Sequence, residues 1–266
     1  MSTILDEIIA HKRKEIEKRK SLQSIASFTE LNCWHRRPRS LKQRLMEESS
    51  TGIIAEFKRK SPSKGWFKTN DLAVDSVVTH YNDAGAAGIS VLTDEYFFGG
   101  TLNDLERAHA VTEIPLLRKD FMIDEWQVAE AKAYGADLIL LIAACLSPKR
   151  VQQLARAAKE TGLEVLLEIH NDQELDHICD EVDMVGVNNR NLKTFEVDVN
   201  LSRSLIGKIP ANKPAIAESG ISNPQTIVSL KEAGFKGFLV GETFMKADQP
   251  GQAFRDFVNE LRSLDR

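Results

Sequence analysis

Short apolar runs alternate with amphipathic stretches from residue 52 to the end of the chain. The runs are rich in leucine and β-branched residues, which is typical of strands buried on both faces, and the intervening stretches repeat apolar positions at helical spacing. Eight runs are strand candidates: residues 52–58, 88–93, 115–121, 138–143, 164–170, 184–188, 214–218 and 237–241. Helix candidates between them include residues 73–84, 124–134, 148–161, 173–178 and 224–233.

This alternation predicts a parallel sheet whose strands are joined by helical crossovers. Eight repeats favour a closed (β/α)8 TIM barrel. Glycines stand where several of the predicted helices would end in a left-handed cap, namely Gly85, Gly135, Gly162 and Gly234. An open doubly wound sheet is the alternative, but no Gly-x-Gly-x-x-Gly motif follows the first strand, which disfavours a dinucleotide-binding domain.

The first fifty residues have a different pattern. Apolar residues at helical spacing predict a helix over residues 3–20 and a shorter one over 41–48, whereas residues 21–40 are irregular. The segment has too few apolar residues to form a core of its own. We therefore predict an N-terminal helical extension, residues 1–50, packed on a catalytic barrel of residues 51–266.

Composition and charge exclude several classes of protein. Charges of both signs are mixed along the chain, and a formal net charge of −4 argues against nucleic acid as a partner. No apolar stretch is long enough for a membrane span, and the Lys/Glu-rich N-terminus lacks the apolar region of a signal peptide. Three cysteines without metal-ligand spacing indicate reduced thiols. We expect a cytoplasmic protein, and a monomer because no apolar seam is evident.

Charged and amide side chains end five of the predicted strands. Side chains alternate along a strand, so Glu56 and Lys58 leave the first strand on one face. Later strands end in Lys119, Glu168, Asn188 and Glu218. Taken alone, Glu56 and Lys58 could be an internal ion pair, but the carboxyl ends of barrel strands meet at one mouth, where active sites lie. The set predicts acid–base catalysis, with His170 as a supporting or structural residue.

Two glycine-containing loops predict an anion site. Ser219-Gly220 follows the seventh predicted strand, and Gly241-Glu242 follows the eighth. Glycine lets a phosphate approach the backbone, and the loops after these two strands are the usual phosphate site of the barrel. Either glycine alone could be an ordinary turn residue. No spacing of His, Cys, Asp or Glu suggests a metal site.

Seven motifs together resemble the indole-3-glycerol-phosphate synthase family. They are Ile54-Ala55-Glu56-Phe57-Lys58-Arg59-Lys60-Ser61-Pro62-Ser63, Phe97-Phe98-Gly99-Gly100, Leu117-Arg118-Lys119-Asp120-Phe121, Leu167-Glu168-Ile169-His170, Gly186-Val187-Asn188-Asn189-Arg190-Asn191-Leu192, Ala217-Glu218-Ser219-Gly220-Ile221 and Val240-Gly241-Glu242. They occur in order across essentially the whole chain, and the combination is highly specific although single pieces are not. Thr101 and Thr243 stand where serine is expected, and both keep the hydroxyl.

The resemblance implies a cytoplasmic carboxy-lyase of tryptophan biosynthesis. The implied reaction is ring closure, decarboxylation and dehydration of 1-(2-carboxyphenylamino)-1-deoxy-D-ribulose 5-phosphate to indole-3-glycerol phosphate. This small-molecule sugar-phosphate anthranilate would be the substrate, with no cofactor and no metal. The family's N-terminal helical extension fits residues 1–50.

The chemistry of this substrate suggests roles for the strand-end residues. Lys119 would be the general acid of ring closure and Glu168 the general base of dehydration, whereas Lys58 would either be the dehydration acid or orient the carboxylate. Glu56, Asn188 and Glu218 complete the expected catalytic set by holding the lysines or the ribulose hydroxyls. The expected substrate- and phosphate-binding residues are Lys60, Ser61, Phe97, Phe121, Arg190, Leu192, Ser219, Gly220, Gly241 and Glu242, with the Glu242 side chain turned away from the anion. Phe97, Phe121, Leu141 and Leu192 would either form the wall for the aromatic ring or belong to the apolar core, and the sequence favours neither.

Two other functions share part of this pattern. An isomerase acting on a phosphoribosyl anthranilate would need the phosphate loops but not Glu56 and Lys58 together with Lys119. A non-catalytic phosphate-ligand binding protein would need Gly220 and Gly241 but not the strand-end lysines and carboxylates. The joint presence of both sets favours the lyase.

Overall fold

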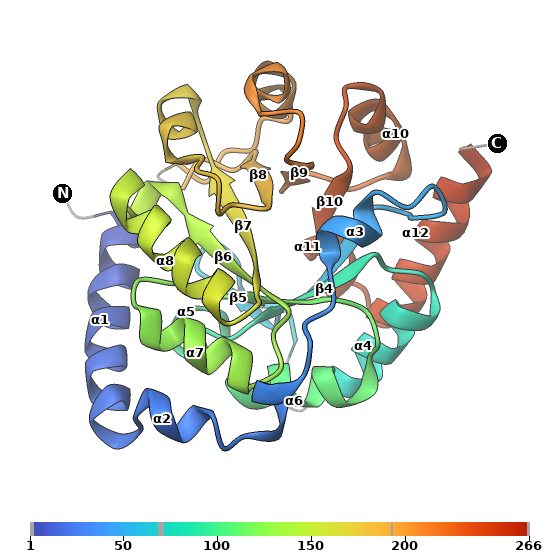
Figure 1. Ribbon diagram of the computed structural model, residues 1–266. Helices are drawn as coiled ribbons and strands as arrows, with labels where there is room; N and C mark the ends of the chain where they lie inside the picture. Colours follow the sequence, from blue (N-terminus) through green and yellow to red (C-terminus); the bar gives the residue numbers. More distant parts are fainter. Residues whose placement is uncertain (1–2, 69–71, 193, 265–266) are drawn as a thin grey trace.

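The computed structural model describes residues 3–68, 72–192 and 194–264 (Figure 1). Within these ranges eight parallel strands close into a barrel in the order β1, β4, β5, β6, β7, β8, β9 and β10, and β10 pairs with β1. The strands are β1 (Ile53–Phe57), β4 (Gly88–Leu92), β5 (Leu116–Lys119), β6 (Leu138–Ile142), β7 (Glu164–Ile169), β8 (Met184–Asn188), β9 (Ala215–Glu218) and β10 (Gly237–Val240). The predicted strands and the predicted TIM barrel are confirmed.

Helices surround the barrel and connect its strands. The longer ones are α4 (Val74–Asp83), α6 (Leu102–Val111), α7 (Glu125–Ala133), α8 (Pro148–Glu160), α9 (Asn200–Leu205), α10 (Pro224–Glu232) and α12 (Pro250–Leu264). Short turns of helix follow several strands: α5 (Glu95–Phe98), η2 (Ala143–Cys145), η3 (Asp172–His177) and α11 (Glu242–Met245). The 3₁₀ helix η4 (Ile206–Lys208) directly follows α9. The four predicted cap glycines all have left-handed φ angles, between 79° and 112°.

Two local predictions were wrong or incomplete. The segment predicted as a helix over residues 173–178 is the 3₁₀ helix η3, because Asn171 caps a turn only six residues long. After β1 the chain forms a small antiparallel hairpin, β2 (Lys60–Ser61) and β3 (Gly65–Trp66), which the apolar pattern did not reveal. Both segments are too short to carry a readable period.

The strands bury both faces in two separate layers of apolar side chains. Residues such as Ile54, Leu140 and Ile142 point to the barrel axis, whereas their neighbours pack under the helices. Leu141 lies in the outer layer, so of its two predicted places the structure shows the apolar core and not the wall of the cavity. Alternation along β6 gives that place to Leu140 and Ile142 instead.

The N-terminal segment wraps the barrel from one end to the other. It consists of α1 (Ile4–Leu22), α2 (Ile25–Phe28), η1 (Asn32–His35) and α3 (Leu41–Leu45), and α1 runs beside α7 and α8 (Figure 1). Leu41 and Leu45 of α3 join the apolar layer on the barrel axis and close its amino-terminal end. The Glu164 carboxylate accepts hydrogen bonds from the backbone amides of Leu41 and Lys42, at 2.8 and 3.1 Å, and so caps α3.

A buried ammonium group fastens α1 to the carboxyl ends of two strands. Lys12 is 1% exposed, and its Nζ lies 2.8 Å from Glu15, 2.9 Å from Asp94 and 3.0 Å from Asp120. The pKa of Asp120 lies below its usual range because Lys12 and Arg118 outweigh the opposing effect of burial. Asp94 lies two residues after the end of β4, and Asp120 directly follows β5, so α1 is positioned against the mouth of the barrel.

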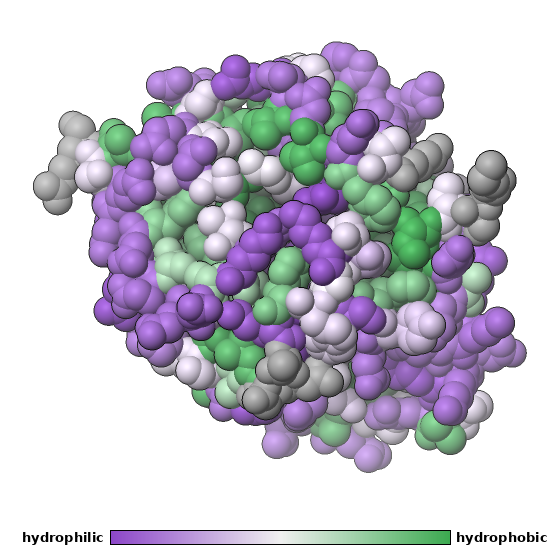
Figure 2. Space-filling model, turned by 180° about the vertical axis from the view of Figure 1, so that it is seen from behind, coloured by the Kyte–Doolittle hydropathy of each residue, from purple (hydrophilic) through white to green (hydrophobic). Residues whose placement is uncertain are grey.

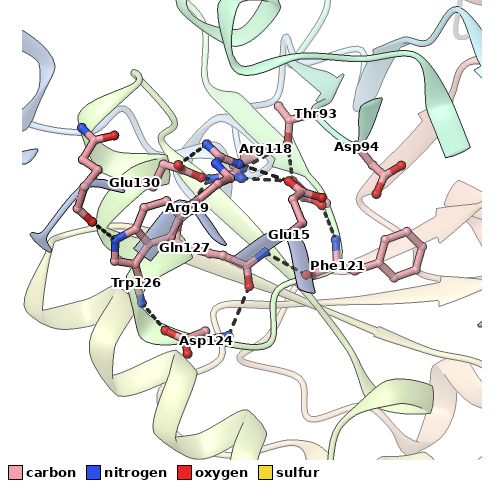
Figure 3. A network of polar contacts seen from close by, with 12 residues as sticks. Glu15, Arg19, Thr93, Asp94, Arg118, Phe121, Asp124, Trp126, Gln127 and Glu130 are labelled. Carbon is pink, nitrogen blue, oxygen red and sulfur yellow. Dashed lines mark hydrogen bonds and ion pairs between the residues drawn. The ribbon is translucent and has the colours of Figure 1, made fainter. Parts of the chain in front are cut away.

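The same ionic network continues behind β5. Arg118 is fully buried and contacts Asp120 at 3.0 Å and Glu130 of α7 at 2.9 Å. Figure 3 shows Arg19 of α1 reaching the same Glu130, so two helices and a strand share one carboxylate.

Among the described residues no helix is long and apolar enough to cross a membrane.

Replacing Lys12 by methionine should destabilise the protein strongly, because Asp94 and Asp120 would stay buried without their cation. Removing one partner of a buried ion pair typically costs about 3–5 kcal/mol of the free energy of unfolding. Urea denaturation measures this loss. Lys14→Met is the matched control, since Lys14 lies exposed on the same helix, and equal losses in the two variants would contradict the account.

Candidate active site

A cavity of about 800 Å³ opens at the carboxyl ends of the barrel strands. Figure 2 shows the molecule from behind, with apolar and pale side chains inside a hydrophilic rim. The cavity wall includes most of the residues expected from the sequence: Glu56, Lys58, Ser61, Lys119, Phe121, Glu168, Asn188, Arg190, Leu192, Glu218, Ser219, Gly220, Gly241 and Glu242. With the other residues of the wall, all eight strands or their following loops contribute to this one space.

Two of the expected binding residues lie outside this wall. Lys60 donates a hydrogen bond to the Tyr96 carbonyl at 2.8 Å and lies over the Trp66 ring at 5.5 Å. Phe97 packs edge-on against His11 and Tyr96 instead of facing the cavity. Strand alternation in the hairpin turns Ser61, not Lys60, toward the cavity, and α5 presents Phe98 in place of Phe97. Lys60 and Phe97, both expected to contact the substrate, are therefore not part of the described cavity wall.

The sequence also left part of the cavity wall unidentified. Ile4, Leu5 and Ile8 of α1 line the cavity beside Leu140 and Ile142 of β6. Helical spacing marked the first three as one apolar face, but nothing in the sequence says which surface that face covers. Lys64, Thr243 and Lys246 also line the cavity, near the phosphate loops.

Lys119 lies at the centre of the polar floor of the cavity. Its Nζ is 2.7 Å from Glu218 and 3.4 Å from Glu168. Asn188 donates a hydrogen bond to the other oxygen of Glu168 at 2.9 Å. A second ion pair joins Lys58 to Glu56 at 2.7 Å. The two lysines and three carboxylates predicted to share a small space do so.

Burial and neighbouring charges shift the pKa values of Lys119, Glu168 and Glu218 in different directions. The pKa of Lys119 is raised above its usual range, because Glu218, Glu168 and Glu56 outweigh the desolvation that would lower it. Burial would raise the pKa of Glu168, but Lys119 and His170 hold it below its usual range. The pKa of Glu218 is raised to about 7, mainly by burial and by the charge of Glu168, against the attraction of Lys119. The cluster thus contains a protonated lysine, an ionised carboxylate and a carboxyl group that titrates near neutral pH.

The loop after β9 has a backbone conformation suited to an anion. Ser219 and Gly220 have φ angles of 65° and 77°, a left-handed pair that a serine rarely adopts. Asn189 stabilises it by donating a hydrogen bond to the Ser219 carbonyl at 3.1 Å, and its own oxygen accepts from the Ser202 hydroxyl at 2.7 Å. Successive backbone N–H groups in a turn can form a concavity that binds an anion, and Gly220 lets such a ligand approach the backbone.

Three cations gather around Glu242 at the start of α11. Its carboxylate lies 2.5 Å from Lys64 and 3.6 Å from Arg190, and it also pairs with Lys246. Burial would raise the pKa of Glu242, but Lys246 and Lys64 lower it to about 2. The carboxylate is therefore ionised, and positive charge is concentrated beside the two glycine loops.

Two glycines leave space for the carboxylates of Glu218 and Glu56. A Cβ atom on Gly186 would lie 2.1 Å from the Glu218 Oε1, and one on Gly241 would lie 2.6 Å from the Glu56 Oε1. These distances are far below van der Waals contact.

In the described part of the chain, no group of His, Cys, Asp and Glu side chains is arranged to hold a metal ion.

The fold and the site together define a TIM-barrel enzyme with an acid–base cluster at its mouth. A sequence model of the family described as "Indole-3-glycerol phosphate synthase" matches residues 5–257. A protein of that name from Bacteroides thetaiotaomicron is 48% identical over 262 residues, covering 98% of this chain and 100% of the relative. One from Koribacter versatilis is 42% identical over 261 residues, covering 97% and 100%. The chain belongs to the indole-3-glycerol phosphate synthase family.

Solved structures of lower identity share the fold. A mutant tryptophan synthase alpha-subunit from Pyrococcus furiosus is 17% identical with a TM-score of 0.61, covering 80% of this chain and 98% of that chain. The alpha subunit from Legionella pneumophila is 15% identical, also with a TM-score of 0.61, covering 84% and 95%. At this level of sequence identity, the similarity to these structures shows a shared barrel fold and nothing more.

Replacing Gly186 by alanine should destabilise the protein by about 1–3 kcal/mol, the usual cost of overpacking a buried site. The new Cβ would displace the Glu218 carboxylate from its ion pair with Lys119. Gly207→Ala is the control, because a Cβ there would meet no atom within 4 Å. Urea denaturation compares the two variants, and an equally small effect at both positions would contradict this packing argument.

The raised pKa of Glu218 makes stability depend on pH in a defined direction. Between its ordinary value of 4.5 and about 7, the unfolded chain releases this proton while the folded chain keeps it, so stability falls as pH rises. Glu218→Gln cannot ionise and should lack this loss. The free energy of unfolding of the variant relative to the wild type should therefore increase from about pH 4.5 to pH 6.5. Parallel pH curves in urea denaturation would show that Glu218 titrates normally.

Proposed function

We propose that this protein catalyses the reaction of its family: the conversion of 1-(2-carboxyphenylamino)-1-deoxy-D-ribulose 5-phosphate to indole-3-glycerol phosphate, carbon dioxide and water. The observation that carries the proposal is the position of Lys119 between Glu168 and Glu218 at the floor of the cavity, 3.4 and 2.7 Å away. This reaction needs both a proton donor and a proton acceptor beside one carbon skeleton. The cluster supplies both.

The substrate would bind with its two ends at opposite walls. Its phosphate would lie on the backbone of Ser219, Gly220 and Gly241, near the positive charge of Arg190, Lys64 and Lys246. Its aromatic ring would lie between apolar side chains of the opposite wall: Ile8, Phe98, Phe121, Leu140, Ile142 and Leu192. Such binding would place the ketone above Lys119.

Lys119 would act in ring closure. The ring carbon that bears the carboxylate attacks the ketone, and the ammonium group protonates the developing alkoxide. Its raised pKa keeps the ammonium charged at neutral pH, so the donor is available in every molecule. Loss of carbon dioxide then restores conjugation, because the electron pair of the broken carbon–carbon bond returns to the ring.

Glu168 would act in dehydration by removing a ring-carbon proton while hydroxide leaves as water. Lys58, fixed by Glu56 at 2.7 Å, would either protonate that hydroxide or orient the substrate carboxylate. Donation of a proton by Lys119 removes one of the charges that hold the pKa of Glu168 low. Glu168 would therefore become a stronger base after ring closure, when dehydration needs one.

We also propose the finer features that follow from this activity. The enzyme would be a carboxy-lyase with a small-molecule substrate, acting as a monomer in the cytoplasm without nucleic-acid partners. Residues 1–50 would form a helical extension that completes the substrate cavity of a catalytic barrel, residues 51–266. The apolar face of α1 in the cavity wall supports this division.

Lys119→Ala should lower kcat/KM by about two to four orders of magnitude while the protein still folds, the usual cost of removing a general acid. The assay follows indole fluorescence and released carbon dioxide with purified protein and the deoxyribulose phosphate substrate. Lys149→Ala is the control, since Lys149 is exposed on α8, away from the cavity. A fully active Lys119→Ala variant would refute the assignment.

The same assay separates the lyase from its alternatives. An isomerase acting on a phosphoribosyl anthranilate would release no carbon dioxide from any substrate. A non-catalytic protein would bind the substrate and leave it intact. Either result with wild-type protein would refute the proposed function while leaving the anion site in place.

A further inference from the structure

His170 lies beside the proposed base although no step of the reaction uses it. It follows the last residue of β7, and strand alternation turns it to the same side as Glu168. Its side chain is only 9% exposed. A buried imidazole next to a catalytic carboxylate requires a reason, since burial of a titratable group is costly without partners.

The turn after β7 brings a second carboxylate back to this ring. The Asn171 side chain caps η3 by accepting from the backbone amides of Gln173 and Glu174, at 2.9 and 3.2 Å. Glu174 then accepts from the backbone amide of His170 at 2.6 Å and from the Asn171 side chain at 3.0 Å. Its carboxylate is thereby fixed 3.2 Å from the His170 Nδ1.

The opposite nitrogen of the ring faces the proposed base. The His170 Nε2 lies 3.1 Å from the Glu168 Oε1, an ion-pair contact whose angle falls short of a hydrogen bond. Asn188 donates to the same oxygen at 2.9 Å, while Lys119 lies 3.4 Å from the other, Oε2. His170 and Asn188 therefore hold the Oε1 atom of Glu168, whereas the Oε2 atom lies on the side of Lys119.

We propose that His170 is a positioning residue for Glu168: anchored by Glu174, its imidazolium holds the Oε1 side of the carboxylate and leaves Oε2 to act on the substrate. The assignment rests on the proposed function, because it takes Glu168 as the base. A neutral imidazole has one N–H and could satisfy only one of the two carboxylates. A neutral ring would also bring the lone pair of one nitrogen against a carboxylate oxygen, whereas both close contacts are attractive for the imidazolium.

The surrounding charges agree with this protonation state. Burial would lower the pKa of His170, but its contacts with Glu168 and Glu174 raise it to about 10. Other titratable groups near it are Cys145 of η2, whose pKa burial raises to about 12, and His177, whose ring contacts backbone carbonyls of Glu174 and Leu146. With Lys119 on the far side, His170 remains the counter-charge of Glu168 after the lysine has given up its proton.

Two conservative variants separate positioning of the base from a structural role. His170→Gln keeps a donor near the place of Nε2, toward Glu168, whereas His170→Asn keeps one near Nδ1, toward Glu174. If His170 positions the base, His170→Asn should lose roughly tenfold or more in kcat, and His170→Gln should retain more activity with little change in KM. If it only ties η3 to β7, His170→Asn should be the better variant, which would overturn the proposal.

The pH profile gives a second readout that a structural role would not move. Loss of the imidazolium raises the pKa of Glu168, so the acid limb of kcat/KM should shift to higher pH in both variants. Melting temperatures of the variants show whether lost activity merely follows lost folding. An unchanged acid limb in both folded variants would contradict the assignment.

A measurement on wild-type protein keeps the proposal independent of the assay. The ¹⁵N shifts of the His170 ring, assigned by their absence in His170→Gln, should report an imidazolium at about pH 8, below the raised pKa. Glu174→Gln should lower that pKa. A neutral ring at this pH would overturn the proposal even if the enzyme is active. Failure of wild-type protein to release carbon dioxide would instead refute the proposed function.

Discussion

The ion pairing of Lys119 with two buried carboxylates is the interaction on which the active site depends. A closed barrel turns alternate strand residues to its axis, so charged residues at several strand ends must share one small space. Glu168 and Glu218 are 3% and 1% exposed, and two carboxylates could not both be ionised there without a cation between them. The lysine that makes the site stable is therefore also the group best placed to donate a proton. The same side chain thus stabilises the folded site and would supply the proton of the proposed reaction.

The same requirement explains how the N-terminal segment is held. Lys12 gives Asp94 and Asp120 the cation that they need, and Arg118 joins Asp120 to Glu130 behind the strand. Because Asp120 directly follows Lys119 in the chain, α1 is tied to the strand end that carries the proposed acid. At the other end of the barrel, α3 closes the axis by apolar packing instead. A segment without a core of its own thus becomes part of both ends of the barrel.

The barrel and most of the cavity wall could be predicted from the sequence because both depend on the alternation of side chains along a strand. Glu56 and Lys58, two positions apart in the first strand, already show which face of that strand is polar. The prediction failed where the chain leaves regular structure. Lys60 was expected beside Ser61, and Phe97 instead of Phe98, because the apolar pattern revealed neither the hairpin nor the short turn of helix that sets the direction of these side chains. Contacts between distant segments were also invisible: nothing marks Lys12 as the partner of Asp94 and Asp120, or Ile8 as part of the cavity. The family resemblance identified motifs, but it could not show how α1 completes the site.

The central claim is that acid and base serve different steps from one charge cluster. The ratio of carbon dioxide to indole product released by Glu168→Gln in a rapid-quench experiment tests it most directly. If Glu168 acts only in dehydration, ring closure by Lys119 still proceeds, and carbon dioxide should appear well before and in excess of the indole. Release of the two products in equal amounts at one common, slowed rate would contradict the division of roles between Lys119 and Glu168.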